Sequence, residues 1–519
     1  MVSLRDNKRI VRNTLFLYVR MIGVMLVTLY TSRVVLDKLG VTDFGLYNSV
    51  GGIVGMLSFL SSSLSTGTSR FLTYELGIGN VDRLHKTFNT AFYTHLLFAL
   101  VIVFVLEALG VWFVKNKLII PPERLTAAIW IFHISVFTTF IAVSQIPYTS
   151  VIVAHENMHI YAVIGLIEAF AKLLIVYLLM VSSVDKLIFY AFLVGLVHFL
   201  IAISYRLYCI KYYAEVRLSF IFEKRTFRRI LSFSGLSLVA NLSQMLSIQG
   251  MVVLINMFFS PAMVAAQSIG NQLGIAIKQF VNSLQTAINP QIIKLYATGD
   301  FLASRNLTLQ SSVYIHELVL FLALPAMVVM DSILHFWLVE VPDYAVVFAQ
   351  YIVLQQIFNV YNGTLYIPMI ASGKLGTNSL IAFWFGIGTF VTLYFMLKMG
   401  FGVMWIQYIG VLQTIIFSYI IKPYILCKEV DYSLYDIFYS LVNTIKVSVI
   451  PVLVSILCTL FLTRKSLIDV VFCILVICFS VILSSYIFLN VDLRKRVNSF
   501  ILGSYIPPDP KPGGYNLCL

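Results

Sequence analysis

The chain has 519 residues, of which 60% are hydrophobic and only 11% are charged. Soluble domains carry about 25% charged residues, so this composition excludes an ordinary soluble protein. An outer-membrane barrel is also excluded, because the segments of about ten residues with alternating apolar and polar side chains that such a barrel needs do not occur. The sequence therefore predicts an all-α polytopic membrane protein.

Fourteen apolar runs are long enough to cross a membrane as helices. A hydrocarbon core of about 30 Å requires roughly 20 such residues. Because fourteen is even, both termini are expected on the same side of the membrane. We expect the spans at about residues 11–33, 44–66, 88–114, 125–153, 159–181, 187–209, 230–258, 262–290, 308–330, 345–371, 379–397, 402–421, 440–463 and 467–489.

The net charge of +13 reflects membrane topology rather than nucleic-acid binding. With both termini in the cytoplasm, the inner loops and tails hold 23 of the 36 Lys and Arg residues, and the outer loops hold 9. This asymmetry follows the positive-inside rule and indicates contact with anionic lipid heads. The main basic cluster falls in and beside the segment between the sixth and seventh spans, at Arg206, Lys211, Arg217, Lys224, Arg225, Arg228 and Arg229.

Two rows of mostly polar residues, 220 positions apart, recur at helical spacing. Steps of three and four residues place each row on one face of a helix. A polar face inside a membrane must look at other helices or at a water-filled cavity, so the rows are expected to line one internal passage. The first row is Asn48, Gly51, Gly55, Ser58, Ser62, Ser65 and Ser69, and the second is Ser268, Asn271, Ile275, Lys278, Asn282, Gln285 and Asn289.

Further landmarks repeat at nearly the same offset. Pro147 matches Pro368 at 221, and Arg20 falls on Asn241 at the same shift. Two six-helix lobes related by an axis along the membrane normal are therefore predicted, as in parallel-repeat transporters. The expected parts are a first lobe over 1–209, a basic cytoplasmic connector over 210–229, a second lobe over 230–422, two extra spans over 423–489 and a cytoplasmic tail over 490–519.

Charged residues inside the spans are the strongest functional signal, since each costs roughly 2.5–3.5 kcal/mol at a helix centre. Arg20 lies near the middle of the first span and Lys278 near the middle of the eighth. Their rows hold few acids, so the excess positive charge favours an anion such as a phosphate. A structural pairing with carboxylates from other helices is the alternative interpretation.

Three further charges within spans are candidates for a role in transport. Glu168 and Lys172 are four residues apart and can pair, either simply to neutralise each other or to couple transport to protons or sodium. Glu317 in the ninth span is the other candidate for coupling. The histidines and the six cysteines show no metal spacing, so neither a metal nor a cofactor is expected.

The remaining polar residues of the passage suit a sugar, because hydroxyls and amides can bond the hydroxyl groups of a glycan. The candidates for lining a glycan cavity are Asn48, Ser58, Ser62, Asn241, Asn271, Asn282 and Gln285.

The segment Leu39-Gly40-Val41-Thr42-Asp43-Phe44-Gly45-Leu46-Tyr47 resembles the L-G-x-x-x-[FY]-G-x-[YF] signature of Wzx-type polysaccharide flippases. These O-antigen and capsule exporters belong to the multidrug/oligosaccharidyl-lipid/polysaccharide (MOP) superfamily. The resemblance implies a V-shaped, MATE-like pair of lobes around a cationic cavity, which Arg20 and Lys278 match. It also implies a bacterial inner-membrane protein that moves an undecaprenyl-diphosphate-linked oligosaccharide to the outer leaflet by alternating access.

The implied pathway is the synthesis of surface polysaccharide such as lipopolysaccharide, with other polysaccharide-assembly membrane proteins as partners. The row in the second span is neutral, whereas flippases of the lipid-linked peptidoglycan precursor carry an arginine there. This difference favours another glycan.

Two alternatives stay open. A cation-coupled multidrug extruder of the same superfamily would need a cavity rich in carboxylates. A membrane glycosyltransferase or polymerase would need catalytic residues on a sizeable outer loop. The outer loops are short, so we expect a transporter rather than an enzyme.

Overall fold

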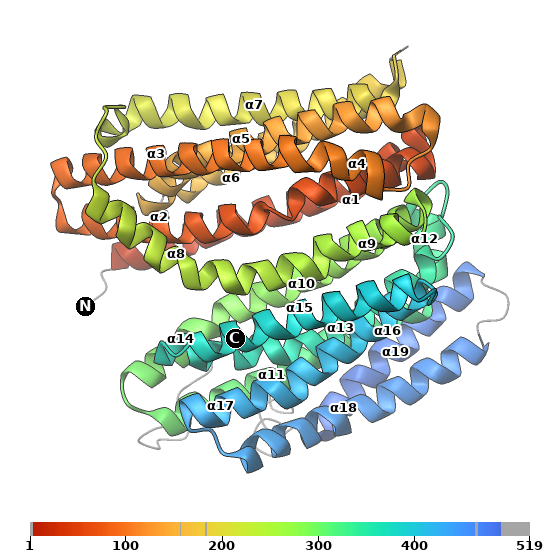
Figure 1. The fold of residues 1–519 in the computed structure, drawn as a ribbon. Coiled ribbons are helices and arrows are strands. Elements are labelled where there is room, and N and C mark those ends of the chain that lie inside the picture. Colours follow the sequence, from red (N-terminus) through yellow and green to blue (C-terminus); the bar gives the residue numbers. More distant parts are fainter. Residues whose placement is uncertain (1–3, 156, 182–183, 462–465, 489–519) are drawn as a thin grey trace.

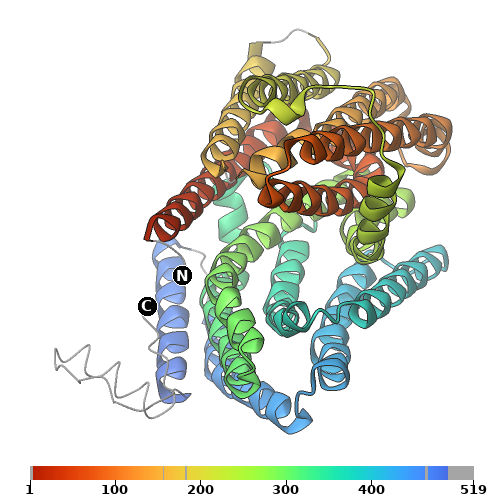
Figure 2. The ribbon, with the colours of Figure 1, turned by 90° about the vertical axis from the view of Figure 1, so that its left-hand side faces the viewer.

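The computed structural model of the chain describes residues 4–155, 157–181, 184–461 and 466–488. Within these ranges every regular element is a helix. The polypeptide forms two neighbouring helical bundles, shown from two directions in Figures 1 and 2. The fold is therefore that of an all-α polytopic membrane protein.

The first bundle contains α1 to α7. Helix α1 is broken at Gly40, which has a φ of 79°. Glycine adopts this conformation without strain, and the chain turns here between the expected first and second spans. The members of the bundle are α1 (Leu4–Gly55), α2 (Ser58–Ile78), α3 (Val81–Val105), α4 (Val111–Lys117), α5 (Leu125–Ala154), α6 (Met158–Val181) and α7 (Lys186–Tyr212).

The second bundle begins where α8 packs against α2, and a final pair of helices, α18 and α19, covers α11 at its edge (Figure 1). The elements are α8 (Lys224–Met245), α9 (Met251–Phe258), α10 (Pro261–Ala297), α11 (Phe301–Val328), α12 (Met330–Trp337), α13 (Ala345–Leu365), α14 (Ile367–Ser372), α15 (Gly376–Lys398), α16 (Met404–Ile416), α17 (Lys422–Val430), α18 (Leu434–Phe461) and α19 (Leu467–Phe488).

Several expected spans are interrupted rather than smooth. A π-helical turn separates α3 from α4, α8 from α9 and α16 from α17, at Leu106–Gly110, Leu246–Gly250 and Phe417–Ile421. Among the described residues, nine helices are long and apolar enough to cross a membrane by those criteria alone. The helices that carry the two polar rows, α1, α2 and α10, do not belong to this set within the described residues.

The segment 213–223 connects the two bundles and runs across one end of the molecule (Figure 1). We call this the connector end, and the opposite end, where α4 and α9 finish, the far end. The connector is fastened to the first bundle by His155, whose ring contacts the Glu215 carboxylate at 2.6 Å, and by Asn89, which donates to the Arg217 carbonyl at 3.1 Å. Burial raises the pKa of Glu215, but the hydrogen bond from His155, a backbone hydrogen bond and the nearby histidines together outweigh burial and leave the pKa below its usual value.

Candidate functional site

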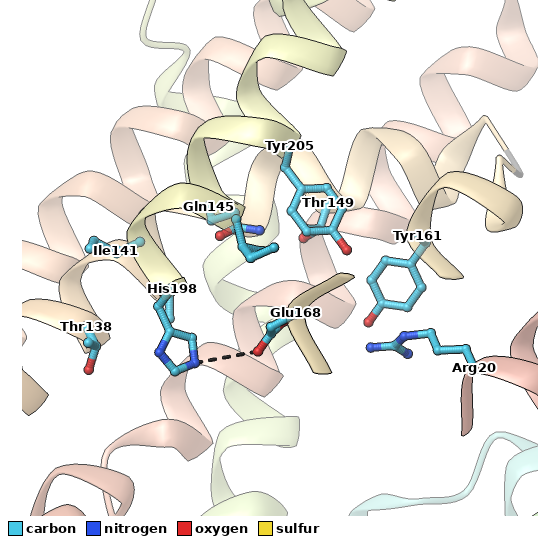
Figure 3. A pocket seen from close by; sticks show the side chains of 11 residues that line it. Arg20, Thr138, Ile141, Gln145, Thr149, Tyr161, Glu168, His198 and Tyr205 are labelled. Carbon is cyan, nitrogen blue, oxygen red and sulfur yellow. Dashed lines mark ion pairs between the residues drawn. The ribbon is translucent and has the colours of Figure 1, made fainter. Parts of the chain in front are cut away.

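A polar pocket of about 170 Å³ lies inside the first bundle, between α1, α5, α6 and α7 (Figure 3). Arg20 comes from α1 and Glu168 from α6, so residues far apart in the sequence share one chamber. Hydroxyl, amide and imidazole groups share the rest of the wall with apolar side chains. The lining residues are Arg20, Thr138, Ile141, Ala142, Gln145, Thr149, Tyr161, Glu168, His198, Ile201 and Tyr205.

Arg20 is positioned by an aromatic ring and a glycine. Its guanidinium carbon lies 4.4 Å from the centroid of the Tyr161 ring, a cation–π contact that partly replaces water. A side chain at Gly165 would overlap the Arg20 side chain, so the glycine makes room for it. The buried Nε of Arg20 has no hydrogen-bond partner among the described residues, and this donor is available to a bound group.

Glu168 brings negative charge to the same pocket. Its carboxylate accepts a hydrogen bond of 2.7 Å from Lys172 Nζ, which confirms that the two residues pair. His198 Nε2 lies 3.6 Å from the same oxygen, and Figure 3 shows this contact beside Arg20. Few acids lie on the helix face that carries Arg20, as expected. In the folded protein, however, α6 places the carboxylate of Glu168 in the same pocket.

Lys278 lies on α10 of the second bundle and is half-buried. It is not among the residues that line the pocket around Arg20. A diphosphate site shared by the two cations stays a prediction.

Several of the side chains expected to line the cavity bond to the protein itself. Asn241 on α8 donates to Ser63 on α2 at 2.8 Å and so joins the two bundles. Gln285 donates to Thr364 on α13 at 3.3 Å, and Asn48 to the backbone carbonyl of Phe44 at 2.8 Å.

The other expected glycan-lining residues are placed as follows. Asn271 accepts a hydrogen bond of 3.4 Å from Gln267 on the same helix. The side chain of Asn282 is exposed. The side chains of Ser58 and Ser62 lie outside the described residues. A glycan role for any of these residues stays a prediction.

The two candidates for ion coupling occupy different places. Glu317 on α11 is hydrogen-bonded to Ser485 on α19, and the neighbouring His316 contacts Ser448 on α18 at 3.0 Å. Glu317 therefore fastens the extra helices to the second bundle. Glu168 shares a pocket with a cation, Arg20.

A contact between the bundles at the far end was not predicted from the sequence. Asn256 on α9 is fully buried and donates to Ser49 on α1 at 3.0 Å. Its carbonyl oxygen accepts from the Ile119 backbone N–H at 2.9 Å. The only signal in the sequence is a single amide inside an apolar run, and such an amide must find partners when buried.

Comparison with known proteins establishes the class of fold. No protein-family model matches the sequence, and no curated protein matches it. The lipid II flippase MurJ in an inward closed conformation is 12% identical, with 91% of this chain and 98% of that chain covered and a TM-score of 0.69.

Two further solved structures, both described as MOP superfamily transporters, show the same likeness. An inward-facing multidrug resistance MATE family transporter is 12% identical, with coverages of 82% and 98% and a TM-score of 0.62. A Pyrococcus furiosus transporter, whose reversed pocket polarity suggests a different function, is 12% identical, with coverages of 84% and 95% and a TM-score of 0.60. The chain thus has the fold of the MOP superfamily transporters.

Proposed function

We propose that the protein is a flippase that carries an undecaprenyl-diphosphate-linked oligosaccharide from the inner to the outer leaflet of the bacterial plasma membrane. The observation that supports this most is the extent of the likeness to the lipid II flippase. That likeness covers 91% of the chain against 82% for the multidrug transporter, a difference of about nine percentage points or roughly 47 of the 519 residues. The pair α18 and α19, with 28 and 22 residues, is about this long.

In this proposal the connector end faces the cytoplasm, as the positive-inside rule requires. The diphosphate docks against Lys278 and Arg20, the glycan lies along the polar faces of α1, α2 and α10, and the prenyl tail stays in lipid. The two bundles rock so that the cavity opens to alternate sides. An inside-negative potential assists, because expelling two negative charges gains about 4.6 kcal/mol per 100 mV.

The pocket around Arg20 supplies the control of this cycle. Glu168 holds Lys172 and lies beside His198 and Arg20, so a proton on its carboxylate would weaken the hold on all of them. Glu168 is therefore our candidate for coupling to protons, ahead of Glu317.

The second candidate function is a cation-coupled multidrug extruder. The likeness to the MATE family transporter and the carboxylate of Glu168 favour it. The structural neighbours are transporters, and we propose no enzymatic activity.

Gene deletion followed by complementation tests the proposal. We expect the deletion strain to lose surface polysaccharide and to accumulate its lipid-linked repeat unit in the inner leaflet. Wild-type protein should restore the polymer, whereas Lys278→Ala and Arg20→Ala should not. Lys446→Ala is the matched control, since this span lysine is exposed on the outer surface of α18.

Normal polysaccharide in the deletion strain would remove the proposed function. Increased drug sensitivity with normal polysaccharide would instead support the extruder. Full restoration by both cavity variants would keep the function but remove the proposed diphosphate site.

A further inference from the structure

Among the described lysines of the second bundle Lys422 is the most deeply buried, with 2% of its surface exposed. It opens α17, directly after the π-helical turn Phe417–Ile421. The expected twelfth span ends one residue before it, so Lys422 was not among the charges expected inside a span. In the structure the helix continues to Val430 and carries the ammonium group into the protein.

The ammonium group of Lys422 sits in a cage of one amide and two rings. Nζ donates to Asn378 Oδ1 on α15 at 2.6 Å. It also lies 4.6 Å from the ring centroid of Tyr366 and 5.6 Å from that of Phe417. Among the described residues Lys422 forms no ion pair. The amide oxygen and the faces of the two aromatic rings therefore stabilise the ammonium group in place of water and a counter-ion.

This cage corresponds to the pocket of the first bundle. The offset of 221 that relates Pro147 to Pro368 places Tyr366 on Gln145 and Lys422 on Ile201. Both Gln145 and Ile201 line the pocket around Arg20. Each bundle therefore holds a cation over a tyrosine ring in the same region of the repeat, Arg20 over Tyr161 and Lys422 over Tyr366.

The two regions differ in their negative charge. The first contains Glu168, whereas the same offset places Thr389 at the equivalent position of the second bundle. A carboxylate can exchange protons and cations. An amide oxygen flanked by two aromatic rings can bind a cation but cannot take up a proton in its place.

We propose that the cage around Asn378, Tyr366 and Phe417 is a monovalent-cation site that the chain fills with its own ammonium group. Shortening Lys422 opens the site to an external ammonium or methylammonium ion. The assignment does not depend on the proposed transport function. If that function holds, the permanent occupation of the cage by Lys422 confines ion exchange to the pocket of the first bundle.

The first experiment measures the melting temperature of purified Lys422→Ala protein in lipid nanodiscs. Ammonium, methylammonium and choline chloride are compared at equal ionic strength, since choline is too large for the space left by a lysine side chain. We expect Lys422→Ala to melt below the wild type and to recover selectively and saturably with ammonium or methylammonium. The wild type and the volume-conserving Lys422→Met variant should show no such selectivity.

An equal response to choline, or no response to the small cations, overturns the proposal. Adding Asn378→Leu to Lys422→Ala should abolish the recovery, because it removes the amide oxygen to which the ammonium group donates. A recovery that persists in the double variant would place the cation elsewhere and would also overturn it.

A second pair of variants decides the matter if Lys422→Ala does not fold. With Lys422 intact, Asn378→Asp should raise the melting temperature, because a carboxylate replaces the amide oxygen that contacts a charged ammonium. Asn378→Leu should lower it. If Asn378→Asp lowers the melting temperature as much as Asn378→Leu does, the cage does not hold a cation and the inference fails.

Discussion

Asn256 of the second bundle and Ser49 of the first are joined by a hydrogen bond of 3.0 Å between Nδ2 and Oγ. Both residues are fully buried. Because Asn256 also accepts from the Ile119 backbone at 2.9 Å, one amide ties three segments together at the far end. A transporter that opens this end must break these bonds.

Replacing Asn256 by Leu should shift the protein towards a state that is open at the far end. The change removes the partner of the Ile119 N–H and one of the two partners of the Ser49 hydroxyl, which keeps its bond to the Gly45 carbonyl. The net worth of one such hydrogen bond is about 0.5–1.5 kcal/mol. About 1.4 kcal/mol changes a population ratio tenfold. Val253→Cys, in a background without other cysteines, should then react faster with a membrane-impermeant maleimide, because Val253 is buried against the first bundle.

The control for this experiment is Asn116→Leu, which removes an exposed amide at the far end that bonds only within its own helix in the described structure. Its labelling rate should equal that of the parent. If Asn256→Leu also leaves the rate unchanged, Asn256 does not hold the far end closed.

Gly45 should be intolerant of any side chain. An added Cβ would overlap the backbone carbonyl of Pro261 at the start of α10, and neither backbone can give way cheaply. Overpacking of this kind costs about 1–3 kcal/mol or more. We expect Gly45→Ala to lower the melting temperature in detergent, whereas Gly51→Ala, whose added Cβ meets nothing within 4 Å, should not. Equal melting temperatures would show that α1 and α10 separate freely.

The same glycine shows what the sequence could predict. The signature around Phe44 and Gly45 indicated a class of transporter, and the structure adds that the glycine permits two helices from different bundles to cross closely. The expected spans were predicted from the lengths of the apolar runs, which depend on the sequence alone. For that reason the helical class could be predicted without knowing any contact.

The surroundings of the polar residues could not be predicted in the same way. Helical spacing gives the face on which Arg20 or Asn241 lies, but not the helix that covers it. Glu168 reaches the Arg20 pocket, and Ser63 takes up the Asn241 amide, only through packing of helices that are distant in sequence. Lys422 was missed because its helix runs on past the end of the apolar run that defined the twelfth span.

Glu168 and Lys172 should be energetically coupled. A double-mutant cycle with Glu168→Gln and Lys172→Met, measured by unfolding in detergent, should give an interaction energy of about 0.5–3 kcal/mol. Glu168→Gln alone should be the more damaging change, because His198 and Arg20 share the same pocket and lose the carboxylate as well. Strict additivity would mean that the 2.7 Å contact contributes nothing to stability.

The connector should make stability depend on pH through Glu215. Burial alone would raise its pKa, but the hydrogen bond from His155, a backbone hydrogen bond and the charges of His155 and His85 together lower the pKa in the folded protein. A carboxyl group with a lowered pKa stabilises the fold above its unfolded pKa, and this stabilisation is lost as the pH falls through the folded value.

The expected result is a difference in melting temperature between the wild type and Glu215→Gln that is full at neutral pH and shrinks below about pH 4.5, the ordinary value for glutamate. Glu340→Gln, which removes an exposed carboxylate far from the connector, corrects for the change in net charge. A difference between wild type and Glu215→Gln that stays constant from neutral pH to well below 4.5 would show that the carboxylate is not held by His155. The segment 213–223 would then be fastened to the first bundle by its other hydrogen bonds, among them those of Asn89 to Arg217 and Ser219 and of His85 to Ser219.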